Sequence, residues 1–119
     1  MTDHQPNDLE DRIRDAYQSA ARTVQTSGAD RVISFMPGVE VGTTFGLGFM
    51  ISSAFSPYGG ARSFGHTGAG GAVGFADPEN GLGFGYVMNQ MMQSPTGDPR
   101  TKGLIQASYD AIGAPVVFL

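Results

Sequence analysis

Residues 64–88 read FGHTGAGGAVGFADPENGLGFGYVM, and this segment determines how the chain folds. From Leu82 to Met88, bulky side chains alternate with glycine or valine, which is the period of a β-strand. A second strand, predicted over residues 72–76, leads into the turn Asp77-Pro78-Glu79-Asn80-Gly81, whose early proline and final Asn-Gly are typical of a hairpin. The segment therefore predicts two antiparallel strands with one bulky face and one glycine face. Another backbone, such as a helix, could lie closely against the glycine face.

A further alternating segment lies upstream, from Thr44 to Ser52, and predicts another strand. Its bulky positions are Phe45, Leu47, Phe49 and Ile51. Of the 18 glycines in the chain, 14 fall between residues 38 and 85, so the glycines and the predicted strands coincide. Because the strands follow one another too closely for parallel crossovers, the sheet should be antiparallel, with helices placed at its ends.

Two helices are predicted to flank these strands. The first spans residues 8–24, and we interpret it as a surface helix with one buried face. Its apolar stripe consists of Leu9, Ile13, Ala16, Tyr17, Ala20 and Val24. The second spans residues 98–113, where Asp98 can cap the helix, Pro99 suits its first turn and Gly113 ends it. Its apolar stripe consists of Leu104, Ile105, Ala111 and Ile112.

These elements predict a single α+β domain over residues 1–119. An antiparallel sheet of three to four strands, within residues 42–90, is flanked by the N-terminal and the C-terminal helix. A polar tail, residues 1–7, precedes the first helix. The apolar C-terminal residues 116–119 are expected to pack on the core. The same is expected of the methionines Met88, Met91 and Met92.

Composition excludes several classes of protein. The 119 residues are 40% hydrophobic, which suffices for one core. The absence of cysteine excludes disulfides, thiolate metal sites and a cysteine nucleophile, and the lone pair His4 and His66 does not form a metal site. We therefore expect no metal and no cofactor. A net charge of −4 gives no electrostatic basis for binding nucleic acid. No segment approaches the roughly 18 apolar residues of a membrane span, and the acidic N-terminus is not a secretory signal, so we expect a cytoplasmic protein.

The candidate functional segment is Ser63 to Gly71, in which a histidine, hydroxyl groups and glycines stand together. The generic motifs fail here. Val73 occupies the last glycine position of a GxGxxG pattern, and the residues around Ser63 lack the first glycine of a nucleophile elbow. From spacing alone, two interpretations stay open. The segment is a glycine-rich turn with an incidental histidine, or it is a strand edge kept bare so that a ligand can lie against its backbone.

Three neighbouring segments, FGHTGAGG (64–71), GFADPE (74–79) and GLGFGYVMN (81–89), resemble the C-terminal part of the β-lactamase-related serine hydrolases. This family includes class C β-lactamases, penicillin-binding proteins, D-aminopeptidases and carboxylesterases that share their fold. The similarity is greatest to the esterase-like members. Upstream, TFGLGF (44–49) is similar to the family strand that precedes this motif. The resemblance covers roughly residues 22–113.

The resemblance implies a substrate-binding site on the predicted strand. In the family, a Lys-Thr-Gly or His-Thr-Gly tripeptide forms the third catalytic motif, and His66, Thr67 and Gly68 match it. By the same resemblance, Ala69 supplies a backbone N–H to the oxyanion hole, and Thr67 donates to a substrate carboxylate or carbonyl. Histidine is mostly uncharged at pH 7, so His66 selects a substrate carboxylate less strongly than lysine would. We therefore expect a small ester or amide as substrate, and esters rather than β-lactams.

The same resemblance shows what the chain lacks. The family nucleophile is the serine of Ser-x-x-Lys, but the only lysine is Lys102, and Pro99 stands three residues before it. The second family motif, Tyr-x-Asn or Ser-x-Asn, is also absent from the sequence. Because no acyl-enzyme forms without a nucleophile, we assign no catalytic nucleophile and expect the chain alone to be inactive.

Two hypotheses follow for the function. In the first, the chain is the C-terminal portion of a β-lactamase-related serine hydrolase. In the second, it is a non-catalytic module derived from that fold, which binds a ligand or partner through the 66–71 edge or through the uncovered strand at 82–88. By resemblance, the N-terminal strands of the family pair with the strand at 82–88. Without them that strand is an exposed edge, and the chain is expected to be marginally stable, to self-associate or to be completed by a complementing N-terminal polypeptide.

Overall fold

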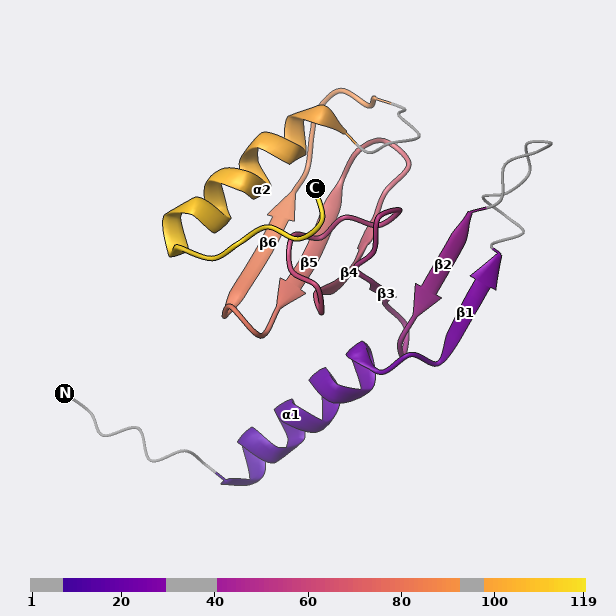
Figure 1. Cartoon of the computed structure of the whole chain (residues 1–119), viewed down its shortest axis with the longest axis vertical. Helices are drawn as coiled ribbons and strands as arrows, with labels where there is room; N and C mark the ends of the chain where they lie inside the picture. Colours follow the sequence, from indigo (N-terminus) through magenta and orange to yellow (C-terminus); the bar gives the residue numbers. More distant parts are fainter. Residues whose placement is uncertain (1–7, 30–40, 93–97) are drawn as a thin grey trace.

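The computed structural model describes residues 8–29, 41–92 and 98–119. Within these residues the chain forms two helices and one antiparallel sheet of six strands, which follow one another in the order β1 to β6 (Figure 1). The elements are α1 (Asp8–Arg22), β1 (Thr26–Ala29), β2 (Gly42–Phe45), β3 (Met50–Ile51), β4 (Phe64–Thr67), β5 (Val73–Asp77), β6 (Leu82–Tyr86) and α2 (Pro99–Ile112). The predicted α+β class is confirmed, with more strands than the three to four expected.

One source of the extra strands is the segment from Thr44 to Ser52. It was predicted as a single strand, and this prediction is wrong, because the chain reverses between Phe45 and Met50, which pair across β2 and β3. Gly48 has a φ of +82°, and the N–H of Gly46 donates to the carbonyl of Phe49 at 2.9 Å, which closes the turn. The glycines in this segment therefore serve a turn rather than a strand face. The other additional strand, β1, pairs with β2 and has no alternation in its sequence.

The hairpin of β5 and β6 is confirmed. Val73 pairs with Tyr86 and Phe75 pairs with Phe84, and Gly81 in the connecting turn has a φ of +63°. The bulky side chains of both strands point to one face, and Gly74, Gly83 and Gly85 lie on the other. A Cβ atom added at any of these three glycines would meet no atom within 4 Å. Among the described residues, therefore, no helix approaches the glycine face as the sequence suggested.

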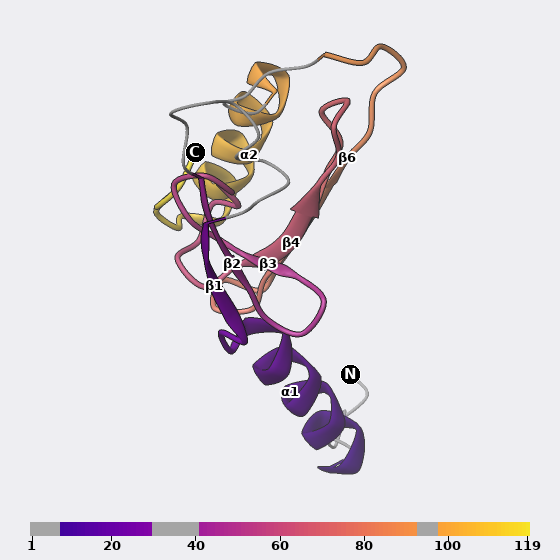
Figure 2. The same ribbon diagram turned by 90° about the vertical axis from the view of Figure 1, so that its right-hand side faces the viewer.

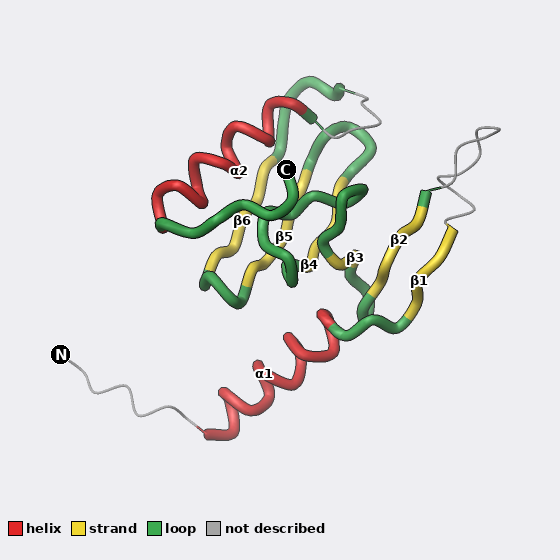
Figure 3. Tube along the Cα trace, in the orientation of Figure 1, coloured by secondary structure: helices red, strands yellow, loops and turns green. Residues whose placement is uncertain are grey.

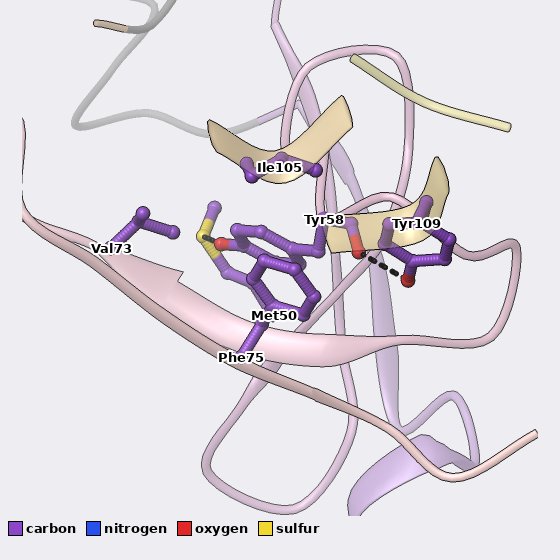
Figure 4. Close-up of a cluster of buried hydrophobic side chains, with 6 residues drawn as sticks. All are labelled: Met50, Tyr58, Val73, Phe75, Ile105 and Tyr109. Atoms are coloured by element: carbon purple, nitrogen blue, oxygen red, sulfur yellow. Dashed lines mark hydrogen bonds between the residues drawn. The ribbon is translucent and has the colours of Figure 1, made fainter. Parts of the chain in front are cut away.

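The core lies between the bulky face of the sheet and α2 (Figure 2). Tyr58 is completely buried and its ring stacks on Phe75, with the centroids 5.8 Å apart (Figure 4). Phe75 in turn stacks on Phe84, with the centroids 5.2 Å apart. The cluster of buried side chains consists of Met50, Tyr58, Val73, Phe75, Ile105 and Tyr109. All six come from residue 50 onward, so the core is built by the C-terminal part of the chain.

Helix α2 begins and ends where the sequence indicates. The Asp98 side chain accepts a hydrogen bond from the Arg100 N–H, Pro99 follows in the first turn, and Gly113 adopts the left-handed conformation at the C-terminus. The predicted apolar stripe is only partly correct. The helix buries Ile105 together with Thr101 and Tyr109, one turn apart on either side, whereas Leu104 and Ile112 are 49% and 47% exposed. The apolar periodicity did not predict this buried face, because two of its three residues, Thr101 and Tyr109, carry hydroxyl groups.

The apolar segments at and near the C-terminus differ in their packing. Residues 116–119 pack on the core only in part. The carbonyl of Gly59 accepts hydrogen bonds from the N–H groups of Val117 at 2.7 Å and Phe118 at 2.9 Å, but the side chains of Val117 and Leu119 are 52% and 42% exposed. Val116 packs against the core. The methionines do not fill it as expected, because Met91 and Met92 are 70% and 40% exposed, and Met88 is half-buried.

Helix α1 extends away from the sheet (Figures 1 and 3). Its last turn meets the β2–β3 turn, where the N–H of Leu47 donates to the carbonyl of Ala20 at 3.2 Å. The predicted buried face is wrong for the described structure, in which Ala21 is buried while Leu9 and Tyr17 are 63% and 74% exposed. The stripe is present, but no described element packs against it. Neither described helix is long and apolar enough to cross a membrane.

Candidate functional site

The four residues predicted to form the site lie together at the exposed end of β4. His66 pairs with Gly74 and Thr67 with Val73, so β5 supports the last two residues of the strand. Gly68 and Ala69 then begin a tight turn, in which the N–H of Gly68 donates to the carbonyl of Ala72 at 2.7 Å, and the N–H of Gly71 donates to that of Gly68 at 3.0 Å. Gly71 has a φ of +108°, which side chains rarely permit. The local fold therefore presents residues 66–69 on a supported turn.

Ala69 is exposed at this turn. Both neighbouring hydrogen bonds use the N–H groups of Gly68 and Gly71, and none of the described residues accepts from the Ala69 N–H. The peptide is held by its neighbours while its own donor stays free. A free backbone N–H on a fixed turn is chemically suited to bind an oxygen atom that carries negative charge.

The His66 ring is oriented by its own strand. Its Nδ1 lies 2.7 Å from the carbonyl oxygen of Thr67. Because a carbonyl oxygen only accepts, Nδ1 must carry the hydrogen, and in the neutral ring Nε2 is then an acceptor. The ring is exposed and its centroid lies 6.3 Å from that of Phe45. His66 can therefore accept a proton or a hydrogen bond through Nε2.

Thr67 is connected to the core through Tyr58. Burial raises the pKa of the Tyr58 hydroxyl, and hydrogen bonds with the side chains of Ser56 and Thr67 partly oppose this shift. The Tyr58 hydroxyl also donates to the sulfur of Met50 at 3.6 Å. The sequence analysis missed Tyr58 because nothing in its surrounding sequence marks it as a neighbour of the His-Thr-Gly segment.

His66 shares its face of the sheet with the bare glycines. It lies opposite Gly74, which in turn pairs with Gly85 in β6, so the three residues point to the face that α2 does not cover. Nothing described lies within 4 Å of a Cβ added at either glycine. This side of the sheet is thus open to a substrate or to another polypeptide. In the described ranges, no three metal-ligating side chains come together to hold an ion.

The turn is supported from behind by the start of α2, which the sequence analysis also missed as part of the site. The Asp98 carboxylate lies against Gly71, and the N–H of Met92 donates to the carbonyl of Gly70 at 2.9 Å. The paired Arg100 guanidinium lowers the pKa of Asp98. Asp98 was predicted only as a helix cap, because its distance from residues 68–71 in the sequence hides the contact.

Comparison with known families and structures places this geometry in context. The model of the Beta-lactamase family matches residues 3–107. The chain belongs to the Beta-lactamase family. The resemblance inferred from the His-Thr-Gly segment and its flanking strands is thereby confirmed.

Two solved structures are similar to the chain. EstA from Arthrobacter nitroguajacolicus Rue61a is 35% identical with a TM-score of 0.65, and the match covers 82% of this chain and 24% of EstA. A family VIII carboxylesterase is 37% identical with a TM-score of 0.63, covering 77% of this chain and 23% of the other. The chain therefore spans about a quarter of the length of either structure. A search of the curated proteins gives no match.

Proposed function

We propose that this chain supplies the oxyanion-binding strand of an esterase-type acyl hydrolase, and that the nucleophile comes from outside these 119 residues. The observation that carries the proposal is the N–H of the exposed residue Ala69, which donates to none of the described residues and lies one residue beyond His66-Thr67-Gly68. When a serine oxygen attacks an ester, the carbonyl oxygen becomes negatively charged. A donor already in place for that oxygen stabilises the transition state more than the ground state.

The two side chains before the turn have distinct roles in this proposal. Thr67 donates to the carbonyl or carboxylate of the substrate, at the end of a strand held by β5. His66 contributes Nε2 as an acceptor on the open face, because its Nδ1 hydrogen is directed at the Thr67 carbonyl. Histidine in place of lysine gives a substrate carboxylate no permanent charge partner, which favours simple esters. The family VIII carboxylesterase among the similar structures supports the same choice.

The missing nucleophile defines the partner. The sequence has no Ser-x-x-Lys, and its single lysine, Lys102, lies in α2. Arg22, three residues after Ser19, cannot act as the base because arginine does not lose its proton in proteins. In this proposal a serine nucleophile and its base therefore come from outside these 119 residues to the end of β4, where residues 66–69 lie. By itself the chain performs no acyl transfer.

Reconstitution of a two-chain enzyme tests this function. The full chain would be co-expressed with the part of Arthrobacter EstA that lies upstream of the matched region, and hydrolysis of p-nitrophenyl butyrate would be measured. We expect no turnover from either part alone and turnover from the complex. Ala69→Pro removes the N–H and should lower kcat of the complex by about 100- to 1,000-fold. Ala69→Gly keeps the N–H and should remain within a few-fold of the unmodified complex.

Three results would contradict the proposal. The first is an Ala69→Pro complex as active as the unmodified one. The second is sustained ester turnover by the isolated chain that Ser63→Ala abolishes. The third is a complex that forms and binds ester but hydrolyses none, which would instead favour a non-catalytic binding module.

A further inference from the structure

Asp98 makes more contacts than a helix cap requires. Its carboxylate accepts from the Arg100 N–H at 2.9 Å, which is the capping bond, and its side chain is 1% exposed. The same carboxylate also accepts from the Arg100 guanidinium, with Nε at 2.9 Å and 3.0 Å from its two oxygens and Nη2 at 2.5 Å. An asparagine at position 98 could cap the helix, but it could not form this bidentate ion pair with the Arg100 guanidinium.

The carboxylate occupies the space beside Gly71. A Cβ atom added at Gly71 would collide with Oδ2 of Asp98. The positive φ of +108° at Gly71 also disfavours any side chain there. The turn that presents Ala69 can therefore take its shape only with glycine at this position, and Asp98 fills the room that the glycine leaves.

Arg100 extends the contact to the segment after β6. Its Nη2 donates to the carbonyl of Gln90 at 3.0 Å, and two residues further along, the N–H of Met92 donates to the carbonyl of Gly70 at 2.9 Å. The start of α2, residues 90–92 and the turn 68–71 thus form one hydrogen-bonded network. The Ala69 peptide lies between Gly68 and Gly70, both of which accept hydrogen bonds in the turn or the network.

We propose that Asp98 and Arg100 are positioning residues, which fix the turn 68–71 and thereby the direction of the Ala69 N–H. The inference rests on the proposed function for its catalytic consequence, but not for its structural one. An N–H contributes fully to an oxyanion hole only when its position is fixed before the reaction, and a misplacement of 1 Å can cost about 100-fold in rate. The pair acts on the reaction only through the turn.

Hydrogen exchange of the isolated full chain, followed by NMR, tests the structural part. The reporters are the Gly71 and Met92 amides, which close the turn and join it to residues 90–92, and the Phe75 amide in β5 serves as internal reference. Asp98→Asn keeps the cap and removes the charge, and Arg100→Lys keeps the charge and removes the fork. We expect both variants to speed exchange at Gly71 and Met92 by about tenfold relative to Phe75.

The reconstituted complex tests the catalytic part. Asp98→Asn and Arg100→Lys should lower kcat by about 10- to 100-fold while KM changes little, because the turn acts on the transition state. Ile105→Val in the core of α2 is the matched control. It destabilises the helix from its buried face, far in sequence from the turn, and should leave kcat unchanged.

The outcomes separate the two proposals. Exchange at Gly71 and Met92 that matches the unmodified chain in both variants overturns the positioning role, whatever the activity. If exchange responds but the unmodified complex shows no turnover, the positioning role stands and the proposed function fails. If exchange responds and kcat falls equally in Ile105→Val, the pair is merely structural and the catalytic inference is wrong.

Discussion

Tyr109 joins three parts of the chain through one hydroxyl group. The residue is completely buried in α2, and its O–H donates to Oδ2 of Asp77 at 2.5 Å, at the end of β5. Asp77 is equally buried and also accepts from the backbone N–H groups of Glu79 at 3.2 Å and Asn80 at 3.3 Å. The Tyr109 hydroxyl further approaches the carbonyl of Tyr58 at 3.5 Å. One phenol therefore ties α2 to the β5–β6 turn.

Tyr109→Phe should destabilise the protein by about 1–3 kcal/mol at pH 7, because the Asp77 oxygen stays buried with one partner fewer. Burial, followed by the hydrogen bond to Asp77, raises the pKa of Tyr109 to about 12 from 10.0. A raised pKa gives stability that is complete below pH 10 and is lost as pH rises toward 12. The difference between the two proteins should therefore shrink above pH 10.

Urea unfolding between pH 7 and pH 11 measures both effects. Tyr17→Phe is the control, since Tyr17 is 74% exposed and should give no such difference. An equal stability of the Tyr109→Phe and unmodified proteins at pH 7 would show that the hydrogen bond to Asp77 contributes nothing.

Single residues of the site were predictable only where their chemistry is local in sequence. His66, Thr67 and Ala69 follow one another, so a tripeptide pattern finds them. Asp98 meets Gly71, and Tyr58 meets Thr67, only in three dimensions, because each contact joins segments that are distant in the sequence. No spacing rule links them. The orientation of His66 toward the Thr67 carbonyl is likewise a property of the folded strand.

The strands of the sheet use glycine in two different ways. Gly65 in β4 lies where an added Cβ would collide with the carbonyl oxygen of Gly74 and stand 2.7 Å from Cα of Phe75. Gly85 in β6 lies where an added Cβ would meet nothing within 4 Å. The first glycine permits close pairing of β4 and β5, and the second leaves its face of the sheet empty.

Gly65→Ala should destabilise the protein by about 2 kcal/mol or more, because the β4–β5 backbones must separate to admit the methyl group. Gly85→Ala, which relieves the unfavourable entropy of glycine in a strand, should be neutral or stabilising by up to about 1 kcal/mol. Urea unfolding followed by far-UV circular dichroism measures both. Similar stability of the two variants would contradict the tight approach at Gly65.

An element could be predicted where capping or turn residues mark its ends in the sequence. Helix α2 was found from Asp98, Pro99 and Gly113, and the β5–β6 hairpin from its Pro and Asn-Gly turn, because these residues act on their own backbone. The segment 44–52 was wrongly predicted because alternation with glycine is compatible with a strand and with a tight turn. The φ of +82° at Gly48 shows that the chain turns here. The exposed stripe of α1 could not be foreseen, since periodicity marks an apolar face but not its partner.

Several large apolar side chains of the chain are exposed rather than buried in the core. Leu9, Ile13 and Tyr17 on α1 are 63%, 48% and 74% exposed, and Val87 just after the edge strand β6 is 85% exposed. When two copies of a chain expose apolar area of this kind, its burial between them drives association. We therefore expect the isolated chain to self-associate as its concentration rises.

Sedimentation velocity over a concentration series tests this expectation. Ile13→Ser with Tyr17→Ser should shift the chain toward monomer. Arg12→Ser with Asp15→Ser alters the same helix at exposed polar positions and should not do so. A monodisperse monomer at all concentrations of the unmodified chain would contradict the expectation.

The sheet is narrowest at β3, where Phe45 and Met50 are the one residue pair between β2 and β3 in the described structure. The buried cluster begins at Met50, and of the described residues before it Phe45 alone packs against the cluster, so residues 8–29 and 41–49 can separate with the loss of little core packing. We therefore expect the parts of the protein to unfold in a fixed order. The α1, β1 and β2 unit would detach as one body at low free-energy cost, while the unit from β4 to α2 would persist with its His-Thr-Gly turn intact.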